Sequence, residues 1–317
     1  MNATDRIPFG ATGLMMSRLG IGGGSLASAA GEGGVKAVVD AAWDAGLRYF
    51  DTAAYYAGGE SERRLGLALR GRKRDAYVLG TKTGRYLLPD GTDRFDYSAA
   101  GTEATIRTAL SRLHTERLDL VFIHDVQPSL HGDAYEAQHA LALKGAFPVL
   151  QRLKAAGVVG AIGVAMRDPV PILRLLQEAP FDAVMLAGAC TLLHQEACEA
   201  LLPHCVATGT PVLFAAPFET GILATGATPA ARYRYKPAAP DLLARTAAIE
   251  AVCARHGVTI AAAAIRFPLL CPAVKGVVVG HQAPSELAAN LALLAAEPPV
   301  ALWSDLLAQG LIRAIPA

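Results

Sequence analysis

Cysteine and charge are both scarce in this sequence of 317 residues. The five cysteines are odd in number and never spaced as Cys-x-x-Cys, which argues against a structural zinc site and a disulfide framework. Charged residues make up 18% of the chain, and 29 Lys and Arg nearly balance 28 Asp and Glu. A net charge of +1 offers no electrostatic basis for binding nucleic acid or an anionic membrane. We expect neither partner, and a reducing cytoplasm is the expected location.

Long apolar segments are also missing. Residues 1–6 (MNATDR) hold two opposite charges and no apolar stretch, so no secretory signal is predicted. The longest uncharged stretch, residues 200–218, contains Pro203, Gly209 and Pro211, which divide it into the end of a helix and a following strand. The apolar share of 52% then indicates strands and helices that are covered on both sides.

Short apolar runs alternate with helical patterns along the chain. The expected strands are residues 18–22, 47–51, 77–82, 118–124, 159–164, 183–186, 211–215 and 276–279. The expected helices are residues 35–45, 61–69, 99–113, 137–156, 171–178, 195–208, 240–255 and 285–294, with a loop between the third strand and its helix. Eight units of about 40 residues each are typical of a (β/α)8 TIM barrel.

An open doubly wound sheet alternates strands and helices in the same way. Its dinucleotide-binding fingerprint would open the first strand–helix turn, where residues 20–25 read GIGGGS and lack the last glycine. We therefore expect an α/β TIM barrel that forms one domain over residues 1–317.

Polar residues end three consecutive expected strands. These are Asp51, Lys82 and His124, and Tyr55 and Tyr56 follow in the turn after Asp51. Each alone is at least as readily structural as functional: a turn cap, a buried ion-pair member or a hydrogen-bonded histidine. Strand ends of a parallel barrel open onto one face, however, so together they predict one pocket.

The chemistry that suits this group is proton transfer by a phenol. Tyrosine has a pKa of about 10, too high for a good base at neutral pH. A neighbouring ammonium favours the phenolate and lowers that pKa, a carboxylate holds the ammonium, and an imidazole donates to a carbonyl or hydroxyl oxygen. Lys82 would repel a divalent cation, so we expect no metal.

Several segments are similar to motifs of the aldo-keto reductases. Residues 50–56 (FDTAAYY) with 61–66 (SERRLG) resemble the most specific of them, and LGTK ending at Lys82 and LVFIH ending at His124 complete a tetrad with Asp51 and Tyr56. The other matches are residues 9–14, 215–218 with Gly221, and 279–290, so the resemblance covers nearly the whole chain.

The resemblance implies an oxidoreductase that binds an extended nicotinamide dinucleotide. Tyr56 would be the general acid/base, tuned by Lys82 and Asp51, and His124 would orient the substrate oxygen. The implied cofactor-binding residues are Gly22, Asp51, Ala165, Met166, Ala216, Phe218, Thr220, Gly221, Leu223, His281, Gln282, Glu286 and Asn290. The expected substrate residues are Tyr55, His124 and Trp303, although packing on the barrel wall is the favoured interpretation of Trp303.

Within the family the chain looks most like aldose 1-dehydrogenases, which oxidise C1 of sugars such as L-fucose. The alternatives are a pyridoxal 4-dehydrogenase, a broad-range aldehyde or ketone reductase, and a cofactor-binding regulatory subunit with slow turnover. The expected partner is a small sugar or aldehyde, and the chain would be a monomer or small homo-oligomer.

The chain departs from the family pattern at two places: at the residues expected to contact the carboxamide of the nicotinamide, and at those expected near the adenosine end of the cofactor. This chain has Ala165-Met166 where many members have Ser-Asn. It has Met185 in place of a usual Gln and Ala215 in place of a usual Tyr. Gln282 and Glu286 stand where NADP-binding members place basic residues, which favours NAD over NADP. Glu286 could instead stabilise the start of the last helix. Residues 232–236 (RYRYK) are expected to be a solvated loop or, second, a cofactor lid.

Overall fold

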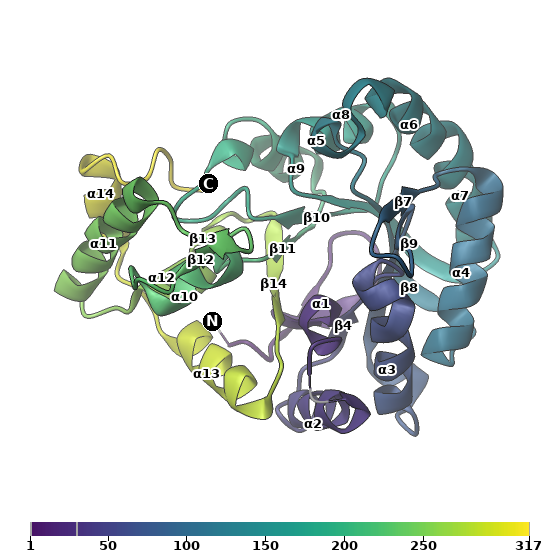
Figure 1. The fold of residues 1–317 in the computed structure, drawn as a ribbon, viewed down its shortest axis with the longest axis horizontal. Helices are drawn as coiled ribbons and strands as arrows, with labels where there is room; N and C mark the ends of the chain where they lie inside the picture. Colours follow the sequence, from purple (N-terminus) through teal and green to yellow (C-terminus); the bar gives the residue numbers. More distant parts are fainter. Residues whose placement is uncertain (1, 30, 317) are drawn as a thin grey trace.

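Eight parallel strands close into a barrel in a computed structural model that describes residues 2–29 and 31–316 (Figure 1). They are β3 (Leu19–Gly22), β4 (Tyr49–Asp51), β5 (Val78–Thr83), β8 (Leu118–His124), β9 (Val159–Met166), β10 (Ala183–Ala187), β11 (Val212–Ala215) and β14 (Val274–Gly280). Consecutive barrel strands pair in chain order, and β14 pairs with β3 to close the ring. The expected TIM barrel is confirmed, and each predicted strand is found within a few residues of its expected bounds.

Helices surround this barrel in Figure 1. The longer ones are α2 (Gly31–Asp44), α3 (Glu60–Leu69), α4 (Ala99–Leu113), α6 (Tyr135–Leu141), α7 (Phe147–Ala155), α8 (Pro169–Glu178), α9 (Leu201–Thr208), α11 (Pro240–Arg255), α12 (Ile260–Arg266), α13 (Pro284–Ala295) and α14 (Val300–Ala308). Shorter ones are α1 (Gly23–Leu26), α5 (Pro128–His131) and α10 (Ile222–Thr225). Their apolar faces pack on the strands; in α2 this face is Val35, Val38, Val39 and Ala42, at helical spacing.

Helix α4 has the same bounds as the helix expected from the sequence, residues 99–113, and a capping residue at each end explains why. Ser98 accepts a hydrogen bond from the Gly101 N–H at 3.1 Å and so caps the first turn. At the other end His114 takes the left-handed conformation, with φ 52°, and ends the helix. Capping residues thus fix where this helix begins and stops.

Two expected helices are interrupted, in both cases at a proline. The helix expected over residues 137–156 is α6 and α7 joined by a short π-helix, η4 (Ala142–Ala146), just before Pro148. The helix expected over residues 195–208 was wrong as one piece, because a short η5 (Glu196–Cys198) precedes α9. Pro203 cannot donate to a preceding turn, so it is tolerated only near a helix start.

Three antiparallel hairpins complete the fold. The first, β1 (Arg6–Pro8) with β2 (Met15–Ser17), closes the barrel end opposite the site, because the buried Phe9 and Met16 join the core inside the barrel. The second, β6 (Arg85–Leu87) with β7 (Asp93–Phe95), occupies the region expected to be a loop. The third, β12 (Arg232–Tyr233) with β13 (Lys236–Pro237), replaces the solvated loop expected at residues 232–236.

Two helix pairs reach the apolar length of a membrane span only when the two members are counted together. They are α11 with the segment 260–270, bent by 95°, and α13 with α14, bent by 88°. Within residues 2–29 and 31–316, no single helix is long and apolar enough to cross a membrane.

Candidate active site

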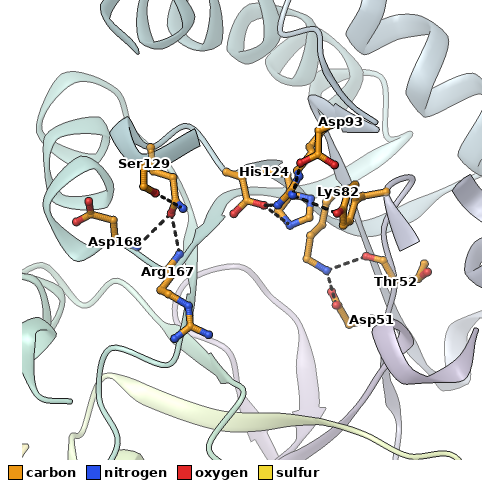
Figure 2. Close-up of polar contacts among 12 residues, drawn as sticks. Asp51, Thr52, Lys82, Asp93, His124, Ser129, Arg167 and Asp168 are labelled. Carbon is orange, nitrogen blue, oxygen red and sulfur yellow. Dashed lines mark hydrogen bonds and ion pairs between the residues drawn. The ribbon is translucent and has the colours of Figure 1, made fainter. Parts of the chain in front are cut away.

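The barrel brings Asp51, Lys82 and His124 together at the carboxyl ends of three neighbouring strands, as Figure 2 shows. Asp51 ends β4, Lys82 lies near the end of β5, and His124 ends β8. Asp51 is level with Gly80 of β5, and Lys82 is level with Phe122 of β8. Tyr56 follows β4 as the first residue of the short helix η1 (Tyr56–Gly59). The predicted constellation therefore meets at one end of the barrel.

Lys82 is almost completely buried and is held by two oxygens. It forms an ion pair with Asp51, and its Nζ donates to the Thr52 carbonyl at 2.8 Å. Asp51 also accepts a hydrogen bond from the Tyr49 hydroxyl at 3.2 Å. Burial alone would lower the pKa of Lys82, but Asp51 and Tyr56 outweigh it and raise that pKa. Lys82 is therefore a permanent cation in the barrel interior.

A second ring of polar contacts fixes the strand that carries Lys82. Glu62 of α3 is 0% exposed, accepts a hydrogen bond from Thr81 at 2.7 Å, and pairs with Arg112 of α4 at 3.1 Å. Ser61 of the same helix contacts Thr52 at 2.9 Å. The two polar residues that open the segment SERRLG thus lock the backbone on both sides of the ion pair.

Tyr56 lies close to both the Lys82 cation and the His124 imidazole. The Lys82 Nζ is 4.9 Å from the centre of the Tyr56 ring, and the His124 ring centre is 6.2 Å from it at an interplanar angle of 88°. Burial raises the pKa of Tyr56, while the charge of Lys82 opposes that rise. The expected net lowering is therefore wrong for the protein alone, although Lys82 acts in the expected direction.

His124 is 7% exposed and neutral at ordinary pH, because burial lowers its pKa to about 4. Its Nε2 lies 3.3 Å from Oδ2 of Asp125, the next residue. The same oxygen accepts a hydrogen bond at 2.6 Å from Arg85 of the β6–β7 hairpin. A neutral imidazole carries one N–H and can donate a hydrogen bond without adding charge to the pocket.

A cavity of about 550 Å³ begins at Asp51 and Tyr56. Its wall includes seven of the expected cofactor residues: Gly22, Asp51, Ala216, Phe218, Thr220, Gly221 and Gln282. Further wall residues are Arg167, Arg232 and Tyr235, so the β12–β13 hairpin lies over the cavity. Glycine is required at Gly280 of this wall, since a Cβ there would lie 2.1 Å from the Ser25 hydroxyl.

The remaining expected cofactor residues are placed differently. Ala165, Met166, Leu223, His281 and Asn290 are buried and are not among the residues that line the cavity. His281 and Asn290 instead contact each other at 3.1 Å.

Glu286 is exposed and accepts a hydrogen bond from the Gln282 N–H at 2.8 Å, so it does support the start of α13.

The two expected substrate residues other than His124 have different surroundings. Tyr55 is partly exposed beneath Arg85, whose guanidinium carbon lies 4.0 Å from the centre of its ring. Trp303 of α14 is 4% exposed and packs against Phe267. The favoured interpretation of Trp303, packing on the barrel wall, is therefore confirmed, and the alternative of a substrate contact is wrong, because the ring is part of the core outside the barrel.

Sequence reasoning missed a charged pair at the cavity. Arg167 follows β9 and lies across the site from Lys82 in Figure 2. Its NH1 pairs with Glu219 at 3.2 Å, and Glu219 is 0% exposed. The only signal for Arg167 was a charge shortly after an apolar strand.

No group of three or more histidine, cysteine or acidic residues that could hold a metal ion is found in the part of the chain that the structure describes.

Comparison with known proteins agrees with this geometry. Residues 18–300 match the aldo/keto reductase family. The chain is 37% identical over 93% of its length to D-threo-aldose 1-dehydrogenase of a Pseudomonas species, covering 94% of that protein. It is 30% identical over 98% of its length to pyridoxal 4-dehydrogenase of Microbacterium luteolum, covering 99% of that protein.

A solved structure extends the likeness to the whole fold. The holo form of an aldo-keto reductase from Bacillus halodurans superposes with a TM-score of 0.80 and 22% identity, covering 99% of this chain and 98% of that one. The family match and the two relatives together show that this chain is an oxidoreductase of the aldo/keto reductase family.

Proposed function

We propose that this enzyme transfers a hydride between a nicotinamide dinucleotide and C1 of an aldose, which it oxidises to the aldonolactone. The observation that carries the proposal is the buried Lys82–Asp51 pair beside Tyr56, with neutral His124 also next to the phenol. The likeness to D-threo-aldose 1-dehydrogenase supports a sugar as the substrate.

The cavity suits an extended dinucleotide. Glycines at Gly22, Gly221 and Gly280 line it and permit close approach of a ligand to the backbone, and Arg167 and Arg232 supply positive charge for an anionic pyrophosphate. When bound, the nicotinamide accepts or supplies the hydride.

The side chains of the protein move and hold the proton. In the oxidation direction, the Tyr56 phenolate takes the proton of the C1 hydroxyl while the C1–H bond breaks and the C1=O bond forms. Lys82 stabilises the phenolate charge before this step, and Asp51 holds Lys82 in place. His124 donates its N–H to the same substrate oxygen, and Tyr56 returns the proton in the reverse reaction.

We also propose that NAD is preferred over NADP. Gln282 lines the cavity, and Glu286 contacts the Gln282 N–H. A carboxylate there repels a 2′-phosphate and can accept hydrogen bonds from a ribose diol. His281 and Asn290, which are buried and contact each other, would then act by packing beneath this segment, and Leu223 is buried in α10.

Pyridoxal is the second candidate substrate, because pyridoxal 4-dehydrogenase covers almost the whole chain at 30% identity. The absorbance of reduced cofactor at 340 nm, followed with a panel of aldoses and pyridoxal and with NAD and NADP, tests both candidates. Rapid turnover of an aldose supports the proposal, and pyridoxal turnover alone supports the second candidate. Cofactor binding without turnover of any compound contradicts both and favours a regulatory subunit.

A further inference from the structure

Asp125 stands next to the proposed reaction centre without being one of the four expected catalytic residues. It follows His124 directly, is 9% exposed, and places Oδ2 3.3 Å from the His124 Nε2. No contact of its other oxygen, Oδ1, is recorded within residues 2–29 and 31–316, and Oδ1 is not among the fully buried atoms that lack a partner. One acceptor oxygen of this carboxylate therefore remains available.

Three contacts fix the position of Asp125. Arg85 donates to Oδ2 at 2.6 Å, the Asp125 N–H donates to the Ala165 carbonyl at 2.9 Å, and its own carbonyl contacts the His131 Nε2 at 3.0 Å. Its backbone has φ 60°, a conformation that non-glycine residues adopt rarely. An aspartate held in this way is pre-organised and does not need to be ordered by a ligand.

Arg85 links this carboxylate to the wall of the site. Besides Asp125 it contacts Asp93 at 2.5 Å and the Tyr55 hydroxyl at 3.1 Å. Tyr55 in turn has its ring centre 6.3 Å from that of His124. The β6–β7 hairpin thus places a guanidinium and a carboxylate beside the imidazole, and carboxylates and guanidinium groups bind hydroxyl groups well.

We infer that Asp125, held by Arg85, accepts a hydrogen bond from the hydroxyl on the carbon next to the reacting carbonyl. This inference rests on the proposed function, in which His124 binds the reacting oxygen. One oxygen of the Asp125 carboxylate lies 3.3 Å from the His124 Nε2, so the two side chains are close enough to contact neighbouring oxygens of one O–C–C–O unit. The site then selects α-hydroxy aldehydes and aldoses over simple aldehydes.

Two aldehydes of similar size test this inference in the reduction direction. Glyceraldehyde carries the neighbouring hydroxyl and propanal does not, so the ratio of their kcat/KM values measures recognition of that hydroxyl. In Asp125→Asn we expect this ratio to fall about 10- to 100-fold, the effect of losing a hydrogen bond to a charged group. Arg85→Lys should also lower the ratio, by a smaller factor. This variant tests the inference if Asp125→Asn does not fold.

Asp119→Asn is the matched control. Asp119 lies on the same strand, β8, is 8% exposed and pairs with Arg74 at 2.7 Å, but it is at the opposite end of the barrel. Its substitution should affect stability and leave the ratio unchanged.

Equal losses on both aldehydes in Asp125→Asn would overturn the inference, because they would show that Asp125 only positions His124. An unchanged ratio in Asp125→Asn would overturn it as well. A wild-type protein that oxidises aldoses but reduces glyceraldehyde no faster than propanal would overturn the inference alone. A wild-type protein that oxidises no aldose and reduces neither aldehyde would overturn the proposed function together with the inference. These outcomes are distinguishable because aldose oxidation by the wild type is lost only in the last one.

Discussion

The ammonium of Lys82 lies 4.9 Å from the centre of the Tyr56 ring while it is paired with Asp51. One buried cation therefore acts on a carboxylate that holds it and on a phenol whose proton is to be moved. A buried ion pair is weak evidence for stability, since desolvation offsets much of its attraction. Its placement beside a phenol is better explained by chemistry than by folding.

Replacing the phenol tests this directly. In Tyr56→Phe we expect the rate of aldose oxidation to fall by about 10²–10⁴, because general acid–base catalysis contributes roughly that factor. Cofactor binding should persist, since the ring itself remains in the cavity wall. Steady-state rates and a fluorescence titration with NADH measure the two effects. Full activity in this variant would contradict a proton-transfer role for Tyr56.

Removing the cation should move the pH profile. Burial raises the pKa of Tyr56 and Lys82 opposes this, so Lys82→Met raises that pKa further. Oxidation needs the phenolate, so the alkaline rise in kcat/KM should begin at higher pH in the variant. The double variant Asp51→Asn with Lys82→Met removes the unpaired carboxylate and should show a smaller displacement in the same direction, because Asp51 itself raises the pKa of Tyr56. An unmoved profile would show that Lys82 does not act on Tyr56.

The apolar runs predicted the barrel well because each strand is covered on both sides and reads as an unbroken hydrophobic segment. Asp51, Lys82 and His124 were predictable for the same reason, since each interrupts such a run at the barrel end where all strands finish. That the three side chains lie close together could be predicted from the barrel's strand order. The burial of Trp303 could not be settled from the sequence, because an amphipathic tail helix can present its tryptophan to the core or to the site.

The contacts around Asp125 and Arg167 were not predictable in this way. The β6 and β7 strands have three residues each and carry Arg85, Asp93 and Arg94, so they show no apolar periodicity. Strand β9 continues to Met166, past its expected end at residue 164, which places Arg167 at the barrel mouth. Both features depend on pairing across the fold, which a local pattern does not contain.

The pH dependence of stability should report the buried histidines. Burial lowers the pKa of His281 to about 4, below its ordinary value of 6.5. The unfolded chain therefore binds this proton first, and stability is lost as the pH falls from 6.5 towards 4. At pH 5 this amounts to about 2 kcal/mol from His281.

The variant His281→Gln isolates that contribution. The decrease in the free energy of unfolding between pH 7 and pH 5, measured by urea denaturation, should be about 2 kcal/mol smaller than in the wild type. His124, with a pKa of about 4, contributes in both proteins and cancels in the comparison. Equal decreases in the two proteins would show that His281 is not kept neutral by burial.

The cofactor preference should respond to the charge at Glu286. In Glu286→Arg we expect kcat/KM with NADP, relative to NAD, to rise about tenfold or more, because a guanidinium pairs with the 2′-phosphate. Glu286→Gln keeps an acceptor for the Gln282 N–H and removes only the charge, so its effect should be smaller. Initial rates with both cofactors measure the ratio. A wild-type enzyme that already favours NADP would contradict the proposed role of Glu286.

The Arg167–Glu219 pair should be energetically coupled. Glu219 is 0% exposed and contacts the Thr191 hydroxyl at 3.4 Å as well as Arg167. Arg167→Met leaves this carboxylate without its cation and should destabilise the fold by about 1–3 kcal/mol, towards the lower value because Arg167 is partly exposed.

Adding Glu219→Gln to Arg167→Met should recover most of that loss, because an amide is far less costly to bury than a carboxylate. Urea denaturation of the wild type, both single variants and the double variant gives the coupling energy. Additive effects would show that water already satisfies Glu219. A recovered double variant would place this pair, like Lys82 and Asp51, among the buried charges that shape the end of the barrel where the cavity lies.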